Sequence, residues 1–163
     1  MNIIQTLVES WDRQCACLNS VAELITEENK HVKPSEDGKS LSHQLVHVHL
    51  VRLEWFKKVS DNPDIDIKHL YRQEGDDWIP SDDLPAVKQA VKQLGEAISA
   101  WLPGALAGGK PSGGYDHPLY FLQHQIWHEG WHIGLIMLAL RLNGQEPTEE
   151  WEEANLWGRW RVE

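Results

Sequence analysis

The residues best suited to chemistry are histidines that recur every four positions, at His124, His128 and His132. A helix turns by about 100° per residue, so side chains at this spacing lie along one narrow stripe. Apolar residues continue the stripe, and we therefore expect the histidines to point inward. Two imidazoles one turn apart can occupy two neighbouring positions on a Zn²⁺, Ni²⁺ or Fe²⁺ ion. The alternative is a set of core histidines held only by hydrogen bonds.

A second pair of histidines, His43 and His47, offers a third ligand. They are also four residues apart, and Glu54 lies near the same edge of the helix on which they are predicted. Spacing alone does not decide which of the two is the ligand. The alternative for His43 is a solvated position near the start of that helix. Either choice predicts one divalent ion on three imidazoles.

The segment HEGWH, residues 128–132, also matches the HExxH pattern of zinc peptidases, in which the glutamate is the general base. Glu129 is the candidate for that role, and an exposed charge is the alternative. Leu135 and Leu138 stand where the metzincin extension has a glycine and a third histidine. No strand that could bind a peptide is predicted before this helix. A third zinc ligand of the gluzincin kind could still come from Glu149, Glu152 or Glu153.

Four segments with helical apolar spacing are predicted to position these residues. Ser40 is expected to cap the second, Pro103 and Gly104 to end the third, and Asp116 to cap the fourth. The pattern predicts an all-α antiparallel four-helix bundle, whose long connections allow a non-sequential order. The predicted helices span residues 2–26, 40–59, 81–102 and 116–143.

The remaining segments are a long connection and a tryptophan-rich tail. Residues 60–81 are too irregular for a long helix, and such a connection is a candidate wall or lid of a pocket. After Pro147 we expect a short acidic helix, with Trp157 and Trp160 packed on the bundle or in a dimer contact. No break in composition divides the chain, so residues 1–163 are predicted to form one domain.

Charge and composition exclude several classes of function. The net charge is −10, which disfavours nucleic acids and anionic membranes as partners. The N-terminus has no secretory signal pattern and no apolar stretch is long enough to span a membrane, so a cytoplasmic protein is expected. Cys15 and Cys17 would point about 200° apart on a helix, so a disulfide between them is not expected.

Two motifs resemble a known family. The run SLSHQLVHVH, residues 40–49, followed by residues 52–56, resembles the DinB/YfiT-like pattern of a serine cap and a ligand histidine seven residues later, which is His47. The run at residues 122–134 is similar to the family signature of His, three residues, His, one residue and Gly. The resemblance implies that His128 and His132 are ligands and that His124 is a site neighbour. Ile133 and Leu135 depart from the Arg or Lys and the Gln usual in the family.

The resemblance also implies a range of functions. Relatives include thiol S-transferases that use bacillithiol or mycothiol, maleylpyruvate isomerase and predicted metal-dependent hydrolases. We therefore expect a metal-dependent enzyme that acts on a small molecule, such as a low-molecular-weight thiol, by thiol transfer or hydrolysis. The alternatives are a non-catalytic, metal-stabilised bundle that forms a homodimer or binds a partner, and a small zinc peptidase.

Overall fold

The computed structural model describes residues 2–62 and 65–161 of the chain. The protein is mostly helical, as predicted, and it also contains one two-stranded antiparallel sheet. The elements are α1 (Ile3–Glu23), α2 (Leu41–Val59), β1 (Tyr71–Glu74), β2 (Asp77–Pro80), α3 (Leu84–Gly108), α4 (Pro118–Leu142), α5 (Glu149–Glu152) and the π-helical turn η1 (Glu153–Trp157).

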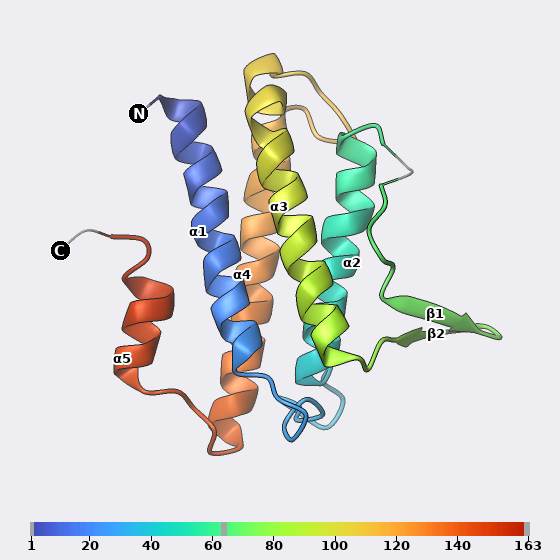
Figure 1. Ribbon diagram of the computed structural model, residues 1–163, viewed down its shortest axis with the longest axis vertical. Helices are drawn as coiled ribbons and strands as arrows, with labels where there is room; N and C mark the ends of the chain where they lie inside the picture. Colours follow the sequence, from blue (N-terminus) through green and yellow to red (C-terminus); the bar gives the residue numbers. More distant parts are fainter. Residues whose placement is uncertain (1, 63–64, 162–163) are drawn as a thin grey trace.

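The four long helices, α1 to α4, pack side by side but not in sequence order (Figure 1). Helix α1 lies beside α3 and α4, and α2 lies beside the same two helices. Figure 1 shows α1 and α4 running in one direction and α2 and α3 in the other. The chain must therefore return along the length of α2 before α3 can begin. This requirement explains the long connection at residues 60–83.

The hairpin of β1 and β2 lies on this return path and corrects the prediction of a strand-free fold. Tyr71 pairs with Pro80 at one end of the ladder, and Glu74 pairs with Asp77 next to the turn. Gly75 in the turn has a φ of +62°, which glycine adopts without a steric penalty. Neither strand buries every second side chain, so the sequence has no alternating apolar pattern there.

Helix boundaries follow their capping residues. Ser40 caps α2 as predicted, because its hydroxyl accepts from the backbone N–H of His43. Helix α3 begins three residues later than predicted, because the Asp83 carboxylate accepts from Ala86 and becomes the cap. Helix α4 is capped by His117 rather than Asp116.

Pro103 does not end α3 as predicted, since the helix continues to Gly108. Proline removes one backbone hydrogen bond and crowds the preceding turn. Burial on both sides of it outweighs this cost: Leu102 is fully buried and Leu106 is 8% exposed. Tertiary packing therefore overrides the local propensity.

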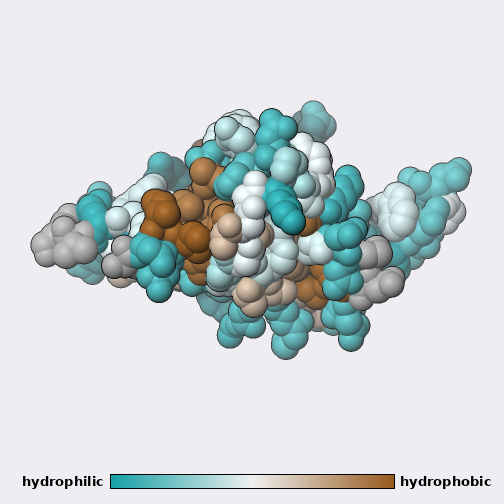
Figure 2. All heavy atoms as spheres, turned by 90° about the horizontal axis from the view of Figure 1, so that it is seen from above, coloured by the Kyte–Doolittle hydropathy of each residue, from teal (hydrophilic) through white to brown (hydrophobic). Residues whose placement is uncertain are grey.

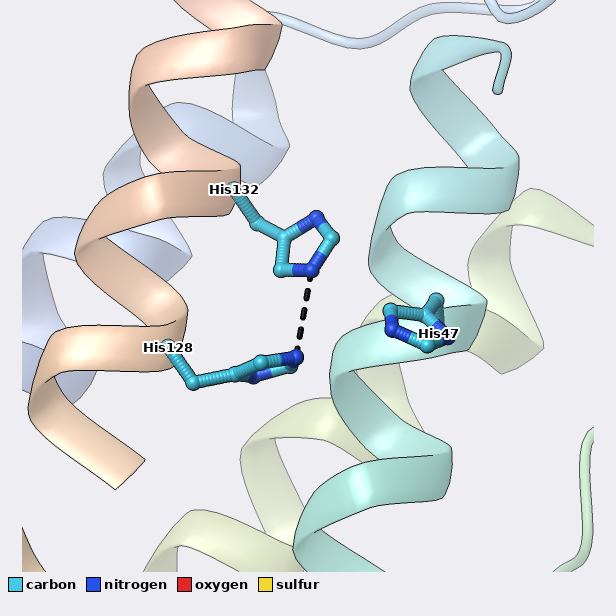
Figure 3. A group of neighbouring side chains, drawn as sticks. All are labelled: His47, His128 and His132. Atoms are coloured by element: carbon cyan, nitrogen blue, oxygen red, sulfur yellow. Dashed lines mark hydrogen bonds between the residues drawn. The ribbon is translucent and has the colours of Figure 1, made fainter. Parts of the chain in front are cut away.

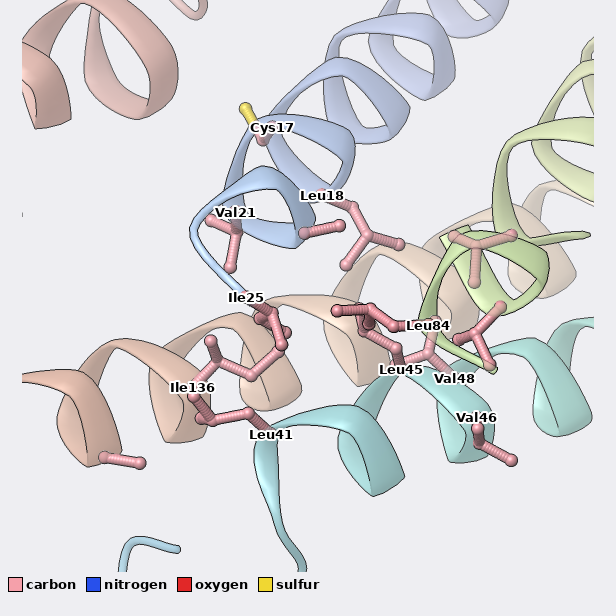
Figure 4. Close-up of a cluster of buried hydrophobic side chains, with 14 of the residues drawn as sticks. Cys17, Leu18, Val21, Ile25, Leu41, Leu45, Val46, Val48, Leu84 and Ile136 are labelled. Atoms are coloured by element: carbon pink, nitrogen blue, oxygen red, sulfur yellow. The ribbon is translucent and has the colours of Figure 1, made fainter. Parts of the chain in front are cut away.

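The core consists of two apolar clusters with a layer of polar side chains between them. One cluster surrounds Leu18, Leu45 and Ile136 (Figure 4), and the other surrounds Trp11, Phe56 and Phe121. Along α1, α2 and α4, buried polar residues fall between the positions that belong to each cluster. We call these residues the polar layer: Gln14, Arg52, Gln125 and Glu129.

The C-terminal segment forms the predicted short acidic helix and packs beside α1 and α4. Leu156 is buried, and the Arg159 guanidinium donates to the Ser20 hydroxyl at 3.1 Å. Trp157 and Trp160, which were expected to pack on the bundle, stay 54% and 43% exposed. Within the described ranges, no helix combines the length and apolar character needed to cross a membrane.

Candidate metal centre

Three histidines from two neighbouring helices converge in the structure. His47 on α2 faces His128 and His132 on α4 (Figure 3). The ring centroids of His128 and His132 are 4.5 Å apart, and those of His47 and His132 are 4.9 Å apart. The four-residue spacing on α4 puts two rings on one face, and the packing of α2 against α4 brings the third.

The ring nitrogens are close enough to share one ion. One nitrogen from each histidine lies within 4.8 Å of the other two, and the Nε2 atoms of His128 and His132 are 3.2 Å apart. Two nitrogens bound about 2.0–2.1 Å from one ion at roughly 90–110° would be about 2.8–3.4 Å apart. The spacing of this pair therefore fits two adjacent coordination positions.

Gln44 sets the tautomer of His132. The Gln44 side-chain N–H donates to the Lys39 carbonyl at 3.2 Å, which turns its Oε1 toward His132 at 2.5 Å from Nδ1. An amide oxygen can only accept, so His132 Nδ1 carries the proton and Nε2 keeps its lone pair. Such a contact is the usual support for a histidine that binds a metal.

The electrostatic surroundings keep the three imidazoles neutral. Burial, followed by the neighbouring histidines, lowers the pKa of His47 to about 4 and that of His132 to about 3. Burial and the nearby His124 also lower the pKa of His128. Neutral imidazole is the form that binds a metal ion. The donor set therefore suits a divalent ion at neutral pH.

The triad has a buried side and an open side. His132 is 7% exposed, whereas His47 and His128 are only partly buried. His128 Nδ1 is buried and has no hydrogen-bond partner among the described residues. Within the same part of the chain, no cysteine, carboxylate or further histidine joins the group. Three protein ligands leave a coordination position for water or substrate.

Two histidines predicted as neighbours lie beside the triad and bind tyrosines. His43 Nε2 is 3.1 Å from the Tyr71 hydroxyl, and His124 Nδ1 is 2.6 Å from the Tyr115 hydroxyl. The His124 ring is 6.3 Å from that of His128. Neither histidine is part of the converging group.

Glu54, the third predicted neighbour, is not brought to the triad. Its side chain is exposed, and its carboxylate lies 3.9 Å from the Lys57 ammonium group. Glu54 follows His47 by seven residues, so it shares the same helix edge but lies two turns away. The sequence correctly placed Glu54 and His47 on the same edge of the helix, but the distance along the helix axis separates the two side chains.

Glu129 is neither at the triad nor exposed, so the expectation of an exposed charge is wrong. Its side chain is fully buried, and its carboxylate accepts from the Arg52 guanidinium at 2.5 and 2.9 Å. The Gln14 amide donates to the same carboxylate at 3.3 Å. These contacts hold Glu129 in the polar layer, and Glu129 is not part of the converging group.

Sequence reasoning missed Gln44 and Arg52 as supporting residues. Both are polar residues within an apolar helical face of α2, next to Leu45 and Leu53, which are fully buried. A polar or charged side chain at such a position indicates that it has a buried hydrogen-bond or ion-pair partner. The identity of that partner depends on which helix packs against α2, and periodicity does not show this.

The comparison with protein families gives a match. The sequence matches the model of the DinB family over residues 1–107 of 163, a region that contains His47 and ends before α4. No match was found among curated proteins or among solved structures. The matched region covers well over half of the sequence and includes the α2 histidine of the triad. The chain belongs to the DinB family.

Proposed function

We propose that this protein is a metal-dependent enzyme that acts on a small molecule by thiol transfer or hydrolysis. The proposal is carried by one observation, the convergence of His47, His128 and His132 as three neutral imidazoles with no fourth protein ligand in the described part of the chain. Structural metal sites are usually closed by four protein ligands, whereas catalytic sites keep a position open.

The ion would be Zn²⁺ or Ni²⁺, or alternatively Fe²⁺, because neutral imidazole suits all three. In this position a divalent ion supplies Lewis-acid chemistry and lowers the pKa of a thiol or of water. A low-molecular-weight thiol or a water molecule would then provide the nucleophile. The proposed substrate is a small molecule, as the family resemblance implies.

Residues of this chain would orient the substrate beside the ion. Tyr71 and Tyr115 bind the two histidines that flank the triad on its own helices, His43 and His124. Burial raises the pKa of Tyr71, and it raises the pKa of Tyr115 to about 12, so both phenols keep their protons at neutral pH. Where a hydroxyl accepts the N–H of its histidine, its own proton stays available to donate to a polar group of a bound substrate.

The zinc-peptidase alternative receives less support from the contacts of Glu129. A general base must reach the proton that it removes, directly or through one water molecule. Both oxygens of Glu129 accept hydrogen bonds from Arg52, and the carboxylate is fully buried. The non-catalytic alternative would be favoured by a fourth protein ligand, and the described residues provide none.

Metal analysis of the untagged protein tests the site. We expect about one equivalent of metal per chain in the parent and its loss in His47→Ala, His128→Ala and His132→Ala. The matched controls are His43→Ala and His124→Ala, which remove neighbouring histidines outside the converging group and should keep the metal. A parent that binds none of Zn²⁺, Ni²⁺ and Fe²⁺ on reconstitution would sink the proposal.

Activity assays separate the enzyme from a metal-stabilised structural protein. Thiol transfer is followed with a low-molecular-weight thiol and 1-chloro-2,4-dinitrobenzene, in which sulfur forms the new bond to carbon and chloride leaves. Hydrolysis is followed with p-nitrophenyl acetate. Turnover that disappears with the metal and returns on reconstitution supports the proposal. A fully loaded protein with no turnover on either substrate class favours the non-catalytic alternative.

A further inference from the structure

A cavity of about 350 Å³ lies between the C-terminal segment and the packed helices, and the proposed function does not use it. Ligand sites for small molecules commonly span about 300–1,000 Å³ and are mostly apolar. Figure 2, a view from above, shows hydrophobic residues at the end of the bundle where α1 begins, which is a different part of the surface. The apolar lining comes from Ile133, Met137, Leu138, Leu156, Trp157 and Trp160.

The cavity is separate from the metal centre. Its α4 wall includes Gly130 and Gly134, and Gly130 follows His128 by two residues. Two residues turn a helix by about 200°, so Gly130 and His128 lie on opposite faces of α4. A ligand in the cavity and an ion at the triad could therefore be bound at the same time.

Gly130 and Gly134 lie in the cavity wall, and close packing does not require glycine at either position. A β-carbon at either position would meet no other atom within 4 Å, so alanine would fit both sites. Glycine inside a helix costs about 0.8–1.0 kcal/mol relative to alanine. Among the described residues, no close contact requires glycine at either position. What the two glycines share is that the absence of a side chain leaves space next to α4 inside the cavity.

The lining also indicates the charge and shape of the occupant. Arg141 and Glu152 are the charged residues of the wall, and they lie 3.9 Å apart. Arg141 is also paired with Glu146, outside the wall, so the lining offers no unpaired positive charge to an anion. The buried polar residues of the wall, Gln14 and Cys17, are uncharged. Trp157 and Trp160 leave 54% and 43% of their surface exposed, and a flat apolar molecule would bury those rings.

We propose that this cavity is a second ligand site, which binds a neutral aromatic small molecule between α4 and the C-terminal segment. The occupant stacks on the tryptophan rings at the cavity wall and lies against the glycine face of α4. Its polar group, where it has one, meets the Gln14 amide or the Cys17 thiol. The site depends on neither the ion nor the chemistry proposed for the triad.

Binding of the neutral fluorescent probe N-phenyl-1-naphthylamine tests the proposal. We expect saturable binding of one probe per chain, with energy transfer from tryptophan. Gly130→Leu places a side chain in the cavity and should weaken binding by at least about tenfold. The control is Gly104→Leu on α3, where a β-carbon also meets nothing within 4 Å but the residue lies outside the cavity. It should bind the probe like the parent.

Three further measurements make the outcome decisive. His128→Ala should lose metal and keep the probe, which separates this site from the proposed function. The anionic probe 8-anilinonaphthalene-1-sulfonate should bind at least about tenfold more weakly than the neutral one. Sedimentation should give the same mass with and without probe. Equal binding by the parent and Gly130→Leu would show that the probe binds another surface, such as the exposed Trp127 and Trp131. That result would overturn the proposal. A probe-dependent or concentration-dependent dimer would overturn it as well.

Discussion

Arg52 and Glu129 form an ion pair between α2 and α4, the two helices that carry the triad. Their side chains are 1% and 0% exposed, and two hydrogen bonds of 2.5 and 2.9 Å join the guanidinium to the carboxylate. Glu129 follows His128 directly, and Arg52 follows His47 by five residues. The ion pair therefore fixes how α2 and α4 are placed relative to each other, and with them the histidines.

Removing one charge of this pair should destabilise the protein strongly. Glu129→Gln leaves the buried Arg52 guanidinium without its counter-charge, and such changes cost about 3–5 kcal/mol. Urea denaturation measures the loss. The double variant Arg52→Met, Glu129→Leu should lose less than Glu129→Gln alone, because it leaves no buried charge unpaired. The variant Glu129→Gln should still bind metal under conditions where it is folded.

The surface pair of Arg13 and Glu9 provides the control for that experiment. Their side chains are 36% and 38% exposed, and exposed pairs contribute about 0–1 kcal/mol. Glu9→Gln should therefore change the free energy of unfolding by less than about 1 kcal/mol. A loss from Glu129→Gln no larger than that from Glu9→Gln would contradict the structural role of the buried pair.

Two glycines of α3 should respond oppositely to alanine. A β-carbon at Gly95 would lie 3.0 Å from both the Arg52 Nη1 and the Cys15 Sγ atoms. Arg52 cannot move away freely, because it also donates to the Val91 carbonyl at 2.9 Å. Gly95→Ala should therefore lower the free energy of unfolding by about 1–3 kcal/mol. A β-carbon at Gly104 would meet no atom within 4 Å, so Gly104→Ala should raise the free energy of unfolding by up to about 1 kcal/mol. Stabilisation by both changes would mean that Arg52 is free to shift.

Gln44 should tune metal affinity without being a ligand. Gln44→Leu removes the acceptor of the His132 Nδ1 proton, and loss of such support lowers metal affinity by about 10–100-fold. Competition with a chromogenic chelator measures the change. Gln44→Glu retains an acceptor oxygen and should restore much of the affinity. Gln89→Leu, at an exposed position on α3, is the control. Unchanged affinity in Gln44→Leu would show that the contact does not support the ion.

Acid should destabilise the metal-free protein. His49 is 1% exposed, and its burial, followed by the nearby Arg52, lowers its pKa from 6.5 to about 4. Between these pH values the unfolded chain takes up a proton that the folded chain does not, so stability falls as pH falls. One such group changes the free energy of unfolding by up to about 1.4 kcal/mol per pH unit. Above pH 6.5 both states are neutral and the effect vanishes.

Denaturation at several pH values between 4 and 7 tests this linkage. His47 and His132 act in the same direction, because burial lowers their pKa values too. His49→Leu should make the pH dependence shallower than that of the parent. A slope that is identical in the parent and in His49→Leu would mean that His49 titrates alike in the folded and unfolded states.

Local sequence patterns predicted much of the helical framework and the composition of the candidate site. Apolar spacing placed all four long helices, and the serine at position 40 marked the start of α2. The four-residue spacing put His128 and His132 on one face of α4, because helix periodicity is a property of the chain itself. The family resemblance, rather than the spacing, selected His47 over His43. The structure brings His47 to the other two histidines.

Contacts between segments distant in the sequence were decided only by the tertiary structure. The parallel direction of α2 and α3, the hairpin between them and the continuation of α3 past Pro103 all depend on burial against other helices. The same holds for Glu129, whose position beside His128 indicated a catalytic base or an exposed charge. Periodicity gives the direction of a side chain from its own helix, but its partner depends on which helix packs opposite. For Glu129 that partner is Arg52, 77 residues earlier in the chain.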